Sequence, residues 1–238
     1  ECRRGAAAQI CQGGPVRSRQ VPPSSGETRQ LKVLFEASWW SEGPPSLRRV
    51  LRESILTWQE RFPNDHLALI VKPDARESAI ADLGAGVTVR TTRWRPQALA
   101  AMVATVIPSM RMRPDVVFTH NFTSLTPFAK RVVLVHDFMF CEHPEWFTRA
   151  ENAYFSLMPR TAPAATMIFA TSQTEAGRIS HYLGGRTVVP VGLGMSRDLM
   201  HAPTAQELPA SLSDLGSGRV LVALLDDGRM AQDGAQPE

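Results

Sequence analysis

The chain has 238 residues, of which 43% are hydrophobic, and a net charge of +3. A chain of this length and composition can build a substantial core, so we expect a globular protein. Residues 1–30 hold five arginines and two acidic residues, whereas residues 201–238 hold two arginines and six acidic residues. The intervening 170 residues carry a net charge of only +4, which is too little to indicate a nucleic-acid partner.

Hydropathy and cysteine content indicate the cellular compartment of the protein. No run of 18 apolar residues occurs, so no transmembrane segment is expected. The apolar stretch near the N-terminus is short and interrupted by glutamines, unlike a signal peptide. The three cysteines, Cys2, Cys11 and Cys141, lack the spacing of a metal site. We expect a reduced, cytoplasmic protein, which could also lie peripherally on the inner face of a membrane.

The N-terminal part of the chain changes character at Leu31. Residues 1–30 are rich in Gly, Pro, Ser, Arg and Gln and lack apolar periodicity, so we expect a disordered leader there. A short apolar strand is predicted over residues 31–35, followed by the loop Gly43-Pro44-Pro45. A helix then begins, with Ser46 at its N-cap and apolar residues at helical spacing as far as Trp58.

The alternation of strand and helix continues along the chain. Further strands are predicted at residues 66–71, 87–90, 115–119, 131–135 and 167–170. Helices are predicted around residues 75–83 and 96–107, along an apolar stripe within 147–160, and from a capping box of Ser172 and Glu175 to about residue 183. Continuous, Val-rich apolar strands are typical of parallel strands that are buried on both faces. The pattern predicts an α/β fold with a Rossmann-like, doubly wound parallel sheet.

The composition shifts again beyond Met200, toward Ala, Pro, Ser, Gly and acidic residues. An isolated apolar run, Arg219–Leu225, could be the first strand of a second domain. We therefore expect a Rossmann-like domain over residues 31–203. Residues 204–238 are expected to form a mostly disordered linker and the vestigial start of a second domain that is largely missing.

Ligands of open parallel sheets bind beyond the carboxyl ends of the strands, so residues directly after each strand are candidates for a site. After the first strand, Gly43, Pro44 and Ser46 lead into a helix N-terminus, where free N–H groups can bind an anion or sugar hydroxyls. After the fourth, His120 and Asn121 begin a cluster of hydrogen-bonding side chains. An ordinary βα turn and a polar loop without function are the alternatives at these two places.

The densest group of chemically active side chains follows the fifth strand. Residues 135–147 contain two histidines and three carboxylates, beginning with His136 and Asp137. A general acid/base pair, a metal site and a polar loop are all compatible with this composition. The metal site is the least favoured, because the spacing lacks the i,i+4 face of a zinc helix. A histidine beside a carboxylate can hydrogen-bond a hydroxyl or a phosphate.

Several of these motifs together resemble a known family. The segments are Val133–Asp137, His143–Phe147, Met167–Ser172 and Val188–Gly192. They resemble the N-terminal domain of family 4 retaining glycosyltransferases, over about residues 31–203. The resemblance implies the N-terminal half of a GT-B architecture. In that architecture two Rossmann-like domains face each other across a cleft, with the acceptor mainly on the first and the nucleotide sugar mainly on the second.

The resemblance also implies an activity and roles for individual residues. The implied reaction transfers a hexose from a nucleotide diphosphate sugar to a glycan or lipid-linked hydroxyl acceptor, in polysaccharide or glycoconjugate synthesis, without a metal or other cofactor. His136 matches the histidine that contacts the transferred sugar, and Asp137 would orient its loop. The remaining matches are the glycine loop near the donor phosphates and acceptor (Gly43, Pro44, Ser46) and the residues that line the cleft or cap a helix (Thr171, Ser172).

The sequence departs from the family at its C-terminal end. The donor domain of the family carries two glutamates separated by seven residues, and this sequence has no such pair. We therefore expect a truncated chain that is inactive alone. A non-catalytic module that binds a glycan acceptor is the main alternative, and a nucleotide-sugar epimerase is another. A nicotinamide dehydrogenase would need a glycine-rich fingerprint after Phe35, which the sequence does not contain.

Overall fold

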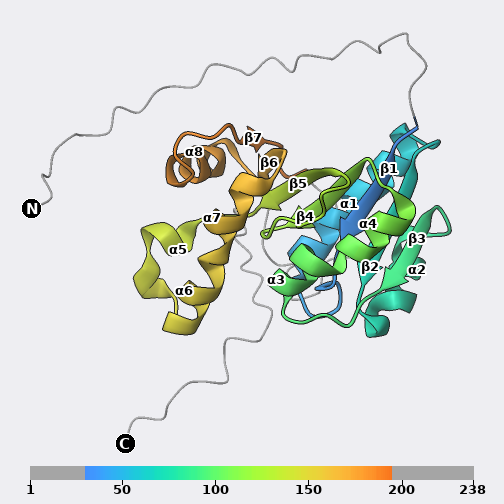
Figure 1. Ribbon diagram of the computed structural model, residues 1–238, viewed down its shortest axis with the longest axis horizontal. Helices are drawn as coiled ribbons and strands as arrows, with labels where there is room; N and C mark the ends of the chain where they lie inside the picture. Colours follow the sequence, from blue (N-terminus) through green and yellow to red (C-terminus); the bar gives the residue numbers. More distant parts are fainter. Residues whose placement is uncertain (1–29, 195–238) are drawn as a thin grey trace, which may run out of the picture.

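The structure is a computed structural model and describes residues 30–194. It contains a seven-stranded sheet in the order β3-β2-β1-β4-β5-β6-β7, in which every neighbouring pair is parallel (Figure 1). The predicted α/β fold with a Rossmann-like, doubly wound sheet is confirmed. Apart from Gln30, the predicted leader lies outside the described residues, as do residues 204–238 with the run Arg219–Leu225.

The strands are short and their interiors are buried. Their bounds are β1 Lys32–Glu36, β2 His66–Val71, β3 Val87–Thr91, β4 Val116–His120, β5 Lys130–Val135, β6 Met167–Ala170 and β7 Val189–Pro190. The first six agree with the predicted strands to within one residue at each end. The seventh was not predicted, because two residues that include a proline carry too little pattern to indicate a strand.

The helices connect these strands. Their bounds are α1 Pro45–Arg61, η1 Pro73–Ala75, α2 Arg76–Leu83, α3 Gln97–Leu99, η2 Ala100–Ala104, α4 Val106–Met112, α5 Met139–Glu142, η3 Pro144–Trp146, α6 Arg149–Phe155, α7 Leu157–Thr161, η4 Ala162–Ala164 and α8 Gln173–Tyr182. None of the helices between residues 30 and 194 combines the length and the apolar character needed to cross a bilayer.

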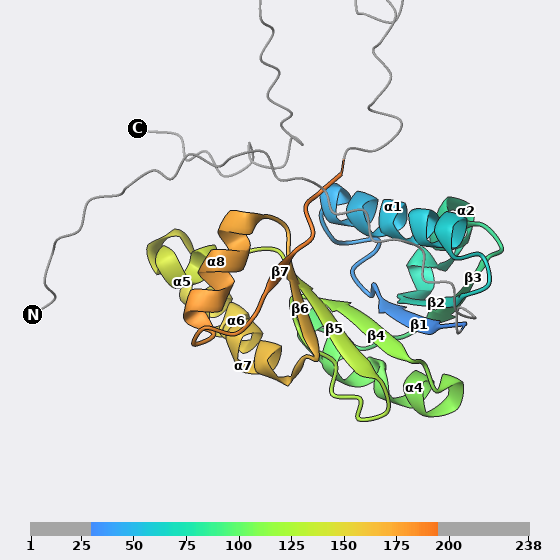
Figure 2. The ribbon, with the colours of Figure 1, turned by 90° about the horizontal axis from the view of Figure 1, so that it is seen from above.

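Helices cover the two faces of the sheet. Leu51 and Ile55 of α1 and Leu83 of α2 pack in one core cluster with Phe35 of β1 and Leu69 of β2. Figure 2 shows α1 and α2 on one side of these strands and α4 on the opposite side. This arrangement explains the continuous apolar runs of the central strands, because both of their faces contact helices.

A second cluster forms the core beneath β5 and β6. Met158 of α7 and Ile179 of α8 pack there with Val133 of β5 and Ile168 of β6. The first cluster extends from β1–β3 to Val116 and Phe118 of β4, and the second supports β5 and β6.

The start of α1 differs from the prediction. The N-cap is Pro44 and the helix begins at Pro45, so Ser46 lies inside the first turn and makes no capping hydrogen bond. Proline suits the first helical position, because its φ is already helical and its missing N–H would have had no partner there.

The predicted capping box at α8 is only half formed. Ser172 Oγ accepts a hydrogen bond from the Glu175 N–H at 3.1 Å, whereas the Glu175 carboxylate binds Arg178. A complete box occurs instead at α6, between Thr148 and Glu151. The sequence Thr148-x-x-Glu151 carries the same signal, which the sequence analysis did not use.

Two long predicted helices are interrupted near prolines. The helix predicted over residues 96–107 is divided into α3, the π-helical η2 and α4, and it continues past Pro108 to Met112. The stripe at 147–160 is divided at Ser156 into α6 and α7, with Pro159 in the first turn of α7. Each proline lacks the N–H that an uninterrupted helix would need at that position, which accounts for the irregular turn before it.

Candidate functional site

The candidate site lies at the carboxyl edge of the sheet, where the strand order reverses. From β1 the chain proceeds to β2 and β3 on one side, and β4 then pairs with the other side of β1. A crevice forms at such a point because the loops after the two adjacent strands run in opposite directions. Glu36 ends β1, His120 ends β4 and His136 directly follows β5. Three ionisable residues therefore lie at the carboxyl ends of β1, β4 and β5.

His120 and His136 form a stacked pair at this edge. Their ring centroids are 5.6 Å apart and their planes differ by 11°. Nε2 of His136 is buried without a hydrogen-bond partner among residues 30–194, whereas the His120 ring lies next to the backbone of Glu36. Buried polar atoms are normally paired, so the unpaired Nε2 of His136 is a candidate for contact with a ligand.

Burial sets the charge of the two imidazoles. It lowers the pKa of His120 well below the usual value, and the neighbouring His136 lowers it further. Burial also lowers the pKa of His136, although Asp137 opposes this effect. Both rings are therefore neutral at neutral pH, and each offers one N–H donor and one acceptor nitrogen.

Two predicted site residues hold the backbone of His136. Asn121 Oδ1 accepts a hydrogen bond from the His136 N–H at 3.2 Å, and the Thr171 hydroxyl donates to the His136 carbonyl at 3.1 Å. Asn121 has a φ of 62°, a left-handed conformation that asparagine tolerates better than most residues. The structure thus brings together His120, Asn121, His136 and Thr171 at the carboxyl ends of β4, β5 and β6. Their role in a site stays a prediction.

The other predicted residues have local structural contacts. Asp137 Oδ1 accepts from the Met139 N–H at 3.1 Å and so fixes the turn into α5. Ser172 caps α8, and Ser46 is exposed in the first turn of α1. The catalytic role of Asp137 and the binding roles of the two serines stay predictions.

Glu36 is a buried carboxyl that the sequence analysis missed. Its side chain is fully buried, and burial raises its pKa from 4.5 to about 7, although a hydrogen bond from Ser38 and the charge of Lys72 oppose the shift. The Ser38 N–H donates to Oε1 at 2.8 Å, whereas Oε2 has no partner in the described part of the chain. A carboxyl with such a pKa exchanges a proton near neutral pH.

The loop after β1 folds back on its own backbone. The Gly43 N–H donates to the Trp39 carbonyl at 2.6 Å. A Cβ at position 43 would lie 2.7 Å from that oxygen and 2.9 Å from Cε3 of the Trp39 ring, so only glycine fits without displacement. Trp39 also contacts the His120 ring edge-on, which connects this loop to the histidine pair.

A pocket of about 600 Å³ opens beside this loop. Trp39, Gly43 and Pro44 line one part of it, and the residues that follow β2 and β3, including Lys72 and Arg95, line another. We call it the carboxyl-edge pocket. The predicted glycine loop therefore lines a cavity that Trp39 links to the histidines, although the histidines do not line it themselves.

A three-residue charge cluster borders the carboxyl-edge pocket. The Lys72 ammonium pairs with Glu42, and Arg95 Nη2 lies 2.8 Å from Glu42 Oε1. The hydrogen bond from Lys72 lowers the pKa of Glu42, so this carboxylate is ionised at neutral pH. Asp74 lies close enough to interact electrostatically with Lys72 and Arg95 as well, so two cations and two anions balance around this pocket.

Glu36 and Lys72 could have been found from the sequence. Each is a charged residue at the carboxyl end of an apolar run, Val33–Phe35 and Leu67–Val71 respectively. The rule that selected His120 and His136 therefore applies to them as well. The contact between Trp39 and His120 carries no such signal, because their residue numbers differ by 81 and only the sheet brings them together.

No protein-family model matches the chain, and no curated protein matches it significantly. Within residues 30–194, no group of three or more His, Cys, Asp or Glu side chains could hold a metal ion. The site combines neutral hydrogen-bonding groups with a pocket lined by charged groups of both signs, an arrangement suited to a polar ligand that carries hydroxyl groups.

Proposed function

We propose that this domain is the acceptor side of a glycosyltransferase, which transfers a hexose from a nucleotide diphosphate sugar to a hydroxyl of a glycan or lipid-linked acceptor. The observation that carries the proposal is the buried, unpaired Nε2 of His136 at the carboxyl end of β5, the strand next to the switch point between β1 and β4. The segment Val133–Asp137 around it is among those that resemble family 4 glycosyltransferases.

The protonation state of the histidines supports a role in binding sugar hydroxyls. A hydroxyl both donates and accepts, and a neutral imidazole can complement either function. Asn121 and Thr171 hold the backbone of His136 through two hydrogen bonds, and this fixes where its side chain begins. Such fixed orientation is what an acceptor or hexose needs in order to lie beside a reacting carbon.

The proposed chemistry requires positioning rather than a covalent intermediate with this domain. The acceptor hydroxyl oxygen forms the new bond to the anomeric carbon, the bond from that carbon to the diphosphate breaks, and the hydroxyl proton passes to the departing diphosphate. In this scheme His136 binds the transferred hexose, and the carboxyl-edge pocket binds the acceptor. Stabilisation of the departing diphosphate falls to cationic groups and helix N-termini of a donor domain.

A ligand-contact experiment tests the proposal on the full chain. Saturation-transfer NMR is recorded with UDP-glucose, GDP-mannose and maltotetraose, for the wild type and for His136→Ala. We expect hexose protons to receive saturation from the wild type, with a several-fold weaker signal for the variant, because one hydrogen bond contributes about 1 kcal/mol. His66→Ala is the matched control, since His66 is exposed at the opposite end of β2.

The same samples distinguish the proposal from its alternative. Release of UDP or GDP when a donor and an oligosaccharide acceptor are both supplied would support group transfer. Binding of maltotetraose without any contact to a nucleotide sugar would instead favour a non-catalytic glycan-binding module. Absence of any hexose contact in the wild type, or equal signals for wild type and His136→Ala, would contradict the role assigned to His136.

A further inference from the structure

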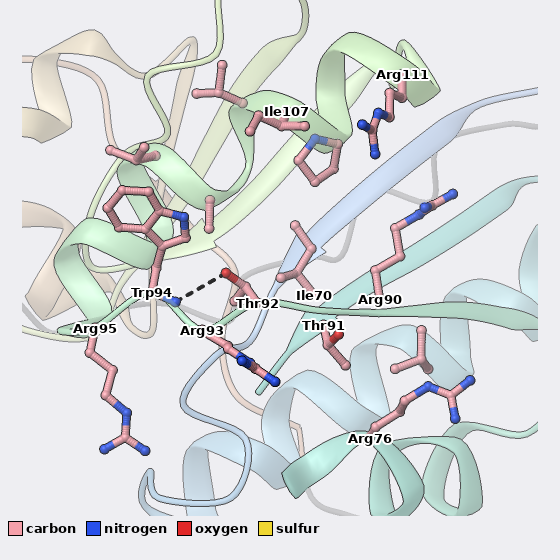
Figure 3. Close-up of a pocket in the computed structure, with 15 residues that line it drawn as sticks. Ile70, Arg76, Arg90, Thr91, Thr92, Arg93, Trp94, Arg95, Ile107 and Arg111 are labelled. Atoms are coloured by element: carbon pink, nitrogen blue, oxygen red, sulfur yellow. Dashed lines mark hydrogen bonds between the residues drawn. The ribbon is translucent and has the colours of Figure 1, made fainter. Parts of the chain in front are cut away.

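A second and larger cavity lies at the free edge of the sheet. It is a groove of about 1080 Å³ between the edge strand β3 and helix α4. Within residues 30–194, β3 pairs only with β2, so its other edge is open to the groove. Figure 3 shows the guanidinium groups of Arg90 and Arg111 near one end of the groove and the indole of Trp94 near the other. We call it the basic groove.

The basic groove is strongly and uniformly charged. Five arginines line it and no acidic residue does; they are Arg76, Arg90, Arg93, Arg95 and Arg111. In the described part of the chain only Arg95 forms an ion pair, with Glu42. Four of the five have no ion pair among the described residues, and in Figure 3 the guanidinium groups of Arg90 and Arg111 lie on the side of β3 that faces α4, whereas those of Arg76 and Arg93 extend to its other side. Cations without an anionic partner in a concave surface attract an anionic ligand.

The type of cation and the apolar side chains of the groove indicate the chemical class of its ligand. Guanidinium groups bind both carboxylates and phosphates through two parallel hydrogen bonds, so the arginines indicate an anionic ligand. The floor includes apolar side chains, and Trp94 and Ile107 remain 48% and 58% exposed. An exposed indole offers a flat surface for the apolar face of a sugar ring.

The basic groove and the carboxyl-edge pocket are neighbours, because Arg95 lines both cavities. An extended ligand that passes Arg95 could contact them in succession. We propose that the groove binds an acidic oligosaccharide with carboxylate groups, whose end reaches the carboxyl-edge pocket as the acceptor. The choice of a sugar rather than a peptide rests on the proposed function, whereas the anionic character follows from the arginines.

Calorimetric titration of the full chain with hexagalacturonate tests this proposal. Maltohexaose is the neutral control and hexaglutamate is the control for charge without sugar. We expect hexagalacturonate to bind more tightly than either, and its affinity to fall as salt is added, because salt screens exposed charges. The double variant Arg90→Gln/Arg111→Gln should weaken binding roughly five- to tenfold, as expected for the loss of two exposed charge contacts.

Matched variants assign the effect to the groove. Arg49→Gln/Arg61→Gln removes two exposed arginines of α1 and should leave the affinity unchanged. Trp94→Ala should weaken hexagalacturonate but not the residual binding of hexaglutamate. Equal binding of hexaglutamate and hexagalacturonate would overturn the assignment to a sugar, and absence of binding, or equal loss in both arginine pairs, would overturn the groove as a site.

The outcome is separable from that of the proposed function. The hexose contact of His136 is read with nucleotide sugars and maltotetraose, and neither Arg90 nor Arg111 belongs to the histidine pair. Loss of hexagalacturonate binding in the groove variant with an intact His136 signal would support the groove independently. If hexagalacturonate does not bind in the groove but the hexose signal depends on His136 as expected, the groove proposal is wrong and the proposed function is unaffected.

Discussion

The indole of Trp39 meets the imidazole of His120 edge-on, with the ring centroids 4.9 Å apart and the planes at 79°. Trp39 also lines the carboxyl-edge pocket, and its carbonyl accepts the hydrogen bond from Gly43. One side chain therefore connects the loop after β1, the pocket and the histidine pair. A change in the loop should be transmitted to His120 through this contact.

Gly43→Ala should destabilise the protein by about 1–3 kcal/mol, because the added methyl group overlaps the Trp39 carbonyl and ring. Urea unfolding gives the free energy of unfolding, and near-ultraviolet circular dichroism reports the displacement of the indole. Gly177→Ala is the matched control. Nothing lies within 4 Å of a Cβ at this position inside α8, so the substitution should stabilise by about 0.5–1 kcal/mol. Equal effects of the two substitutions would contradict the close approach at Gly43.

Glu36→Gln should remove a pH dependence of stability. The pKa of Glu36 is about 7 in the folded state against 4.5 in the reference state, so the folded protein holds the proton more tightly. Its contribution to stability is fully present below pH 4.5 and is lost as the pH rises through 7. Between pH 4.5 and 8, the free energy of unfolding of the wild type should therefore fall by about 3 kcal/mol relative to that of Glu36→Gln.

Urea unfolding of both proteins across this pH range measures the difference. Glutamine can still accept the hydrogen bond from the Ser38 N–H, so the variant isolates the ionisation. Glu77→Gln, at an exposed position in the first turn of α2, provides the control. If the curves of the wild type and Glu36→Gln run parallel from pH 4.5 to 8, the buried carboxyl does not titrate as described.

The histidine pair should make the fold sensitive to acid. Burial lowers the pKa of His120 and His136 below the reference value of 6.5, so below that pH the unfolded chain binds more protons than the folded one. Stability should fall below pH 6.5 by up to about 1.4 kcal/mol per pH unit for each histidine, partly offset by Glu36. His120→Phe keeps an aromatic ring beside Trp39 and should reduce this slope, whereas His66→Asn should not.

Much of the fold could be predicted because each central strand is a continuous apolar run between turn residues. The positions of His120, Asn121 and His136 followed from the rule that ligands bind at strand ends. The helix boundaries were less predictable, because the effect of Pro108 and Pro159 depends on whether a neighbouring turn can rearrange.

The missed parts of the site depend on tertiary structure. Whether Glu36 is solvated or fully buried cannot be read from its neighbours in sequence, yet this burial sets its pKa. The basic groove likewise combines Arg76 of α2, Arg90 of β3 and Arg111 of α4, which no short motif connects. The groove also depends on the open edge of β3, and that edge follows only from the observed strand order.

Asn121 offers a graded test of how His136 is positioned. Asn121→Gly tolerates the φ of 62° but loses the acceptor for the His136 N–H, so it should cost about 1 kcal/mol. Asn121→Leu loses the acceptor and also strains the left-handed backbone, which should add about 1–2 kcal/mol. Asn121→Asp keeps an acceptor at this position and should be the least disruptive of the three.

The negative charge of Asn121→Asp should also raise the pKa of His136, which NMR titration of the imidazole measures. Equal stabilities for the glycine and leucine variants would show that the backbone is unstrained, and an unchanged His136 titration in Asn121→Asp would place the carboxylate away from the ring.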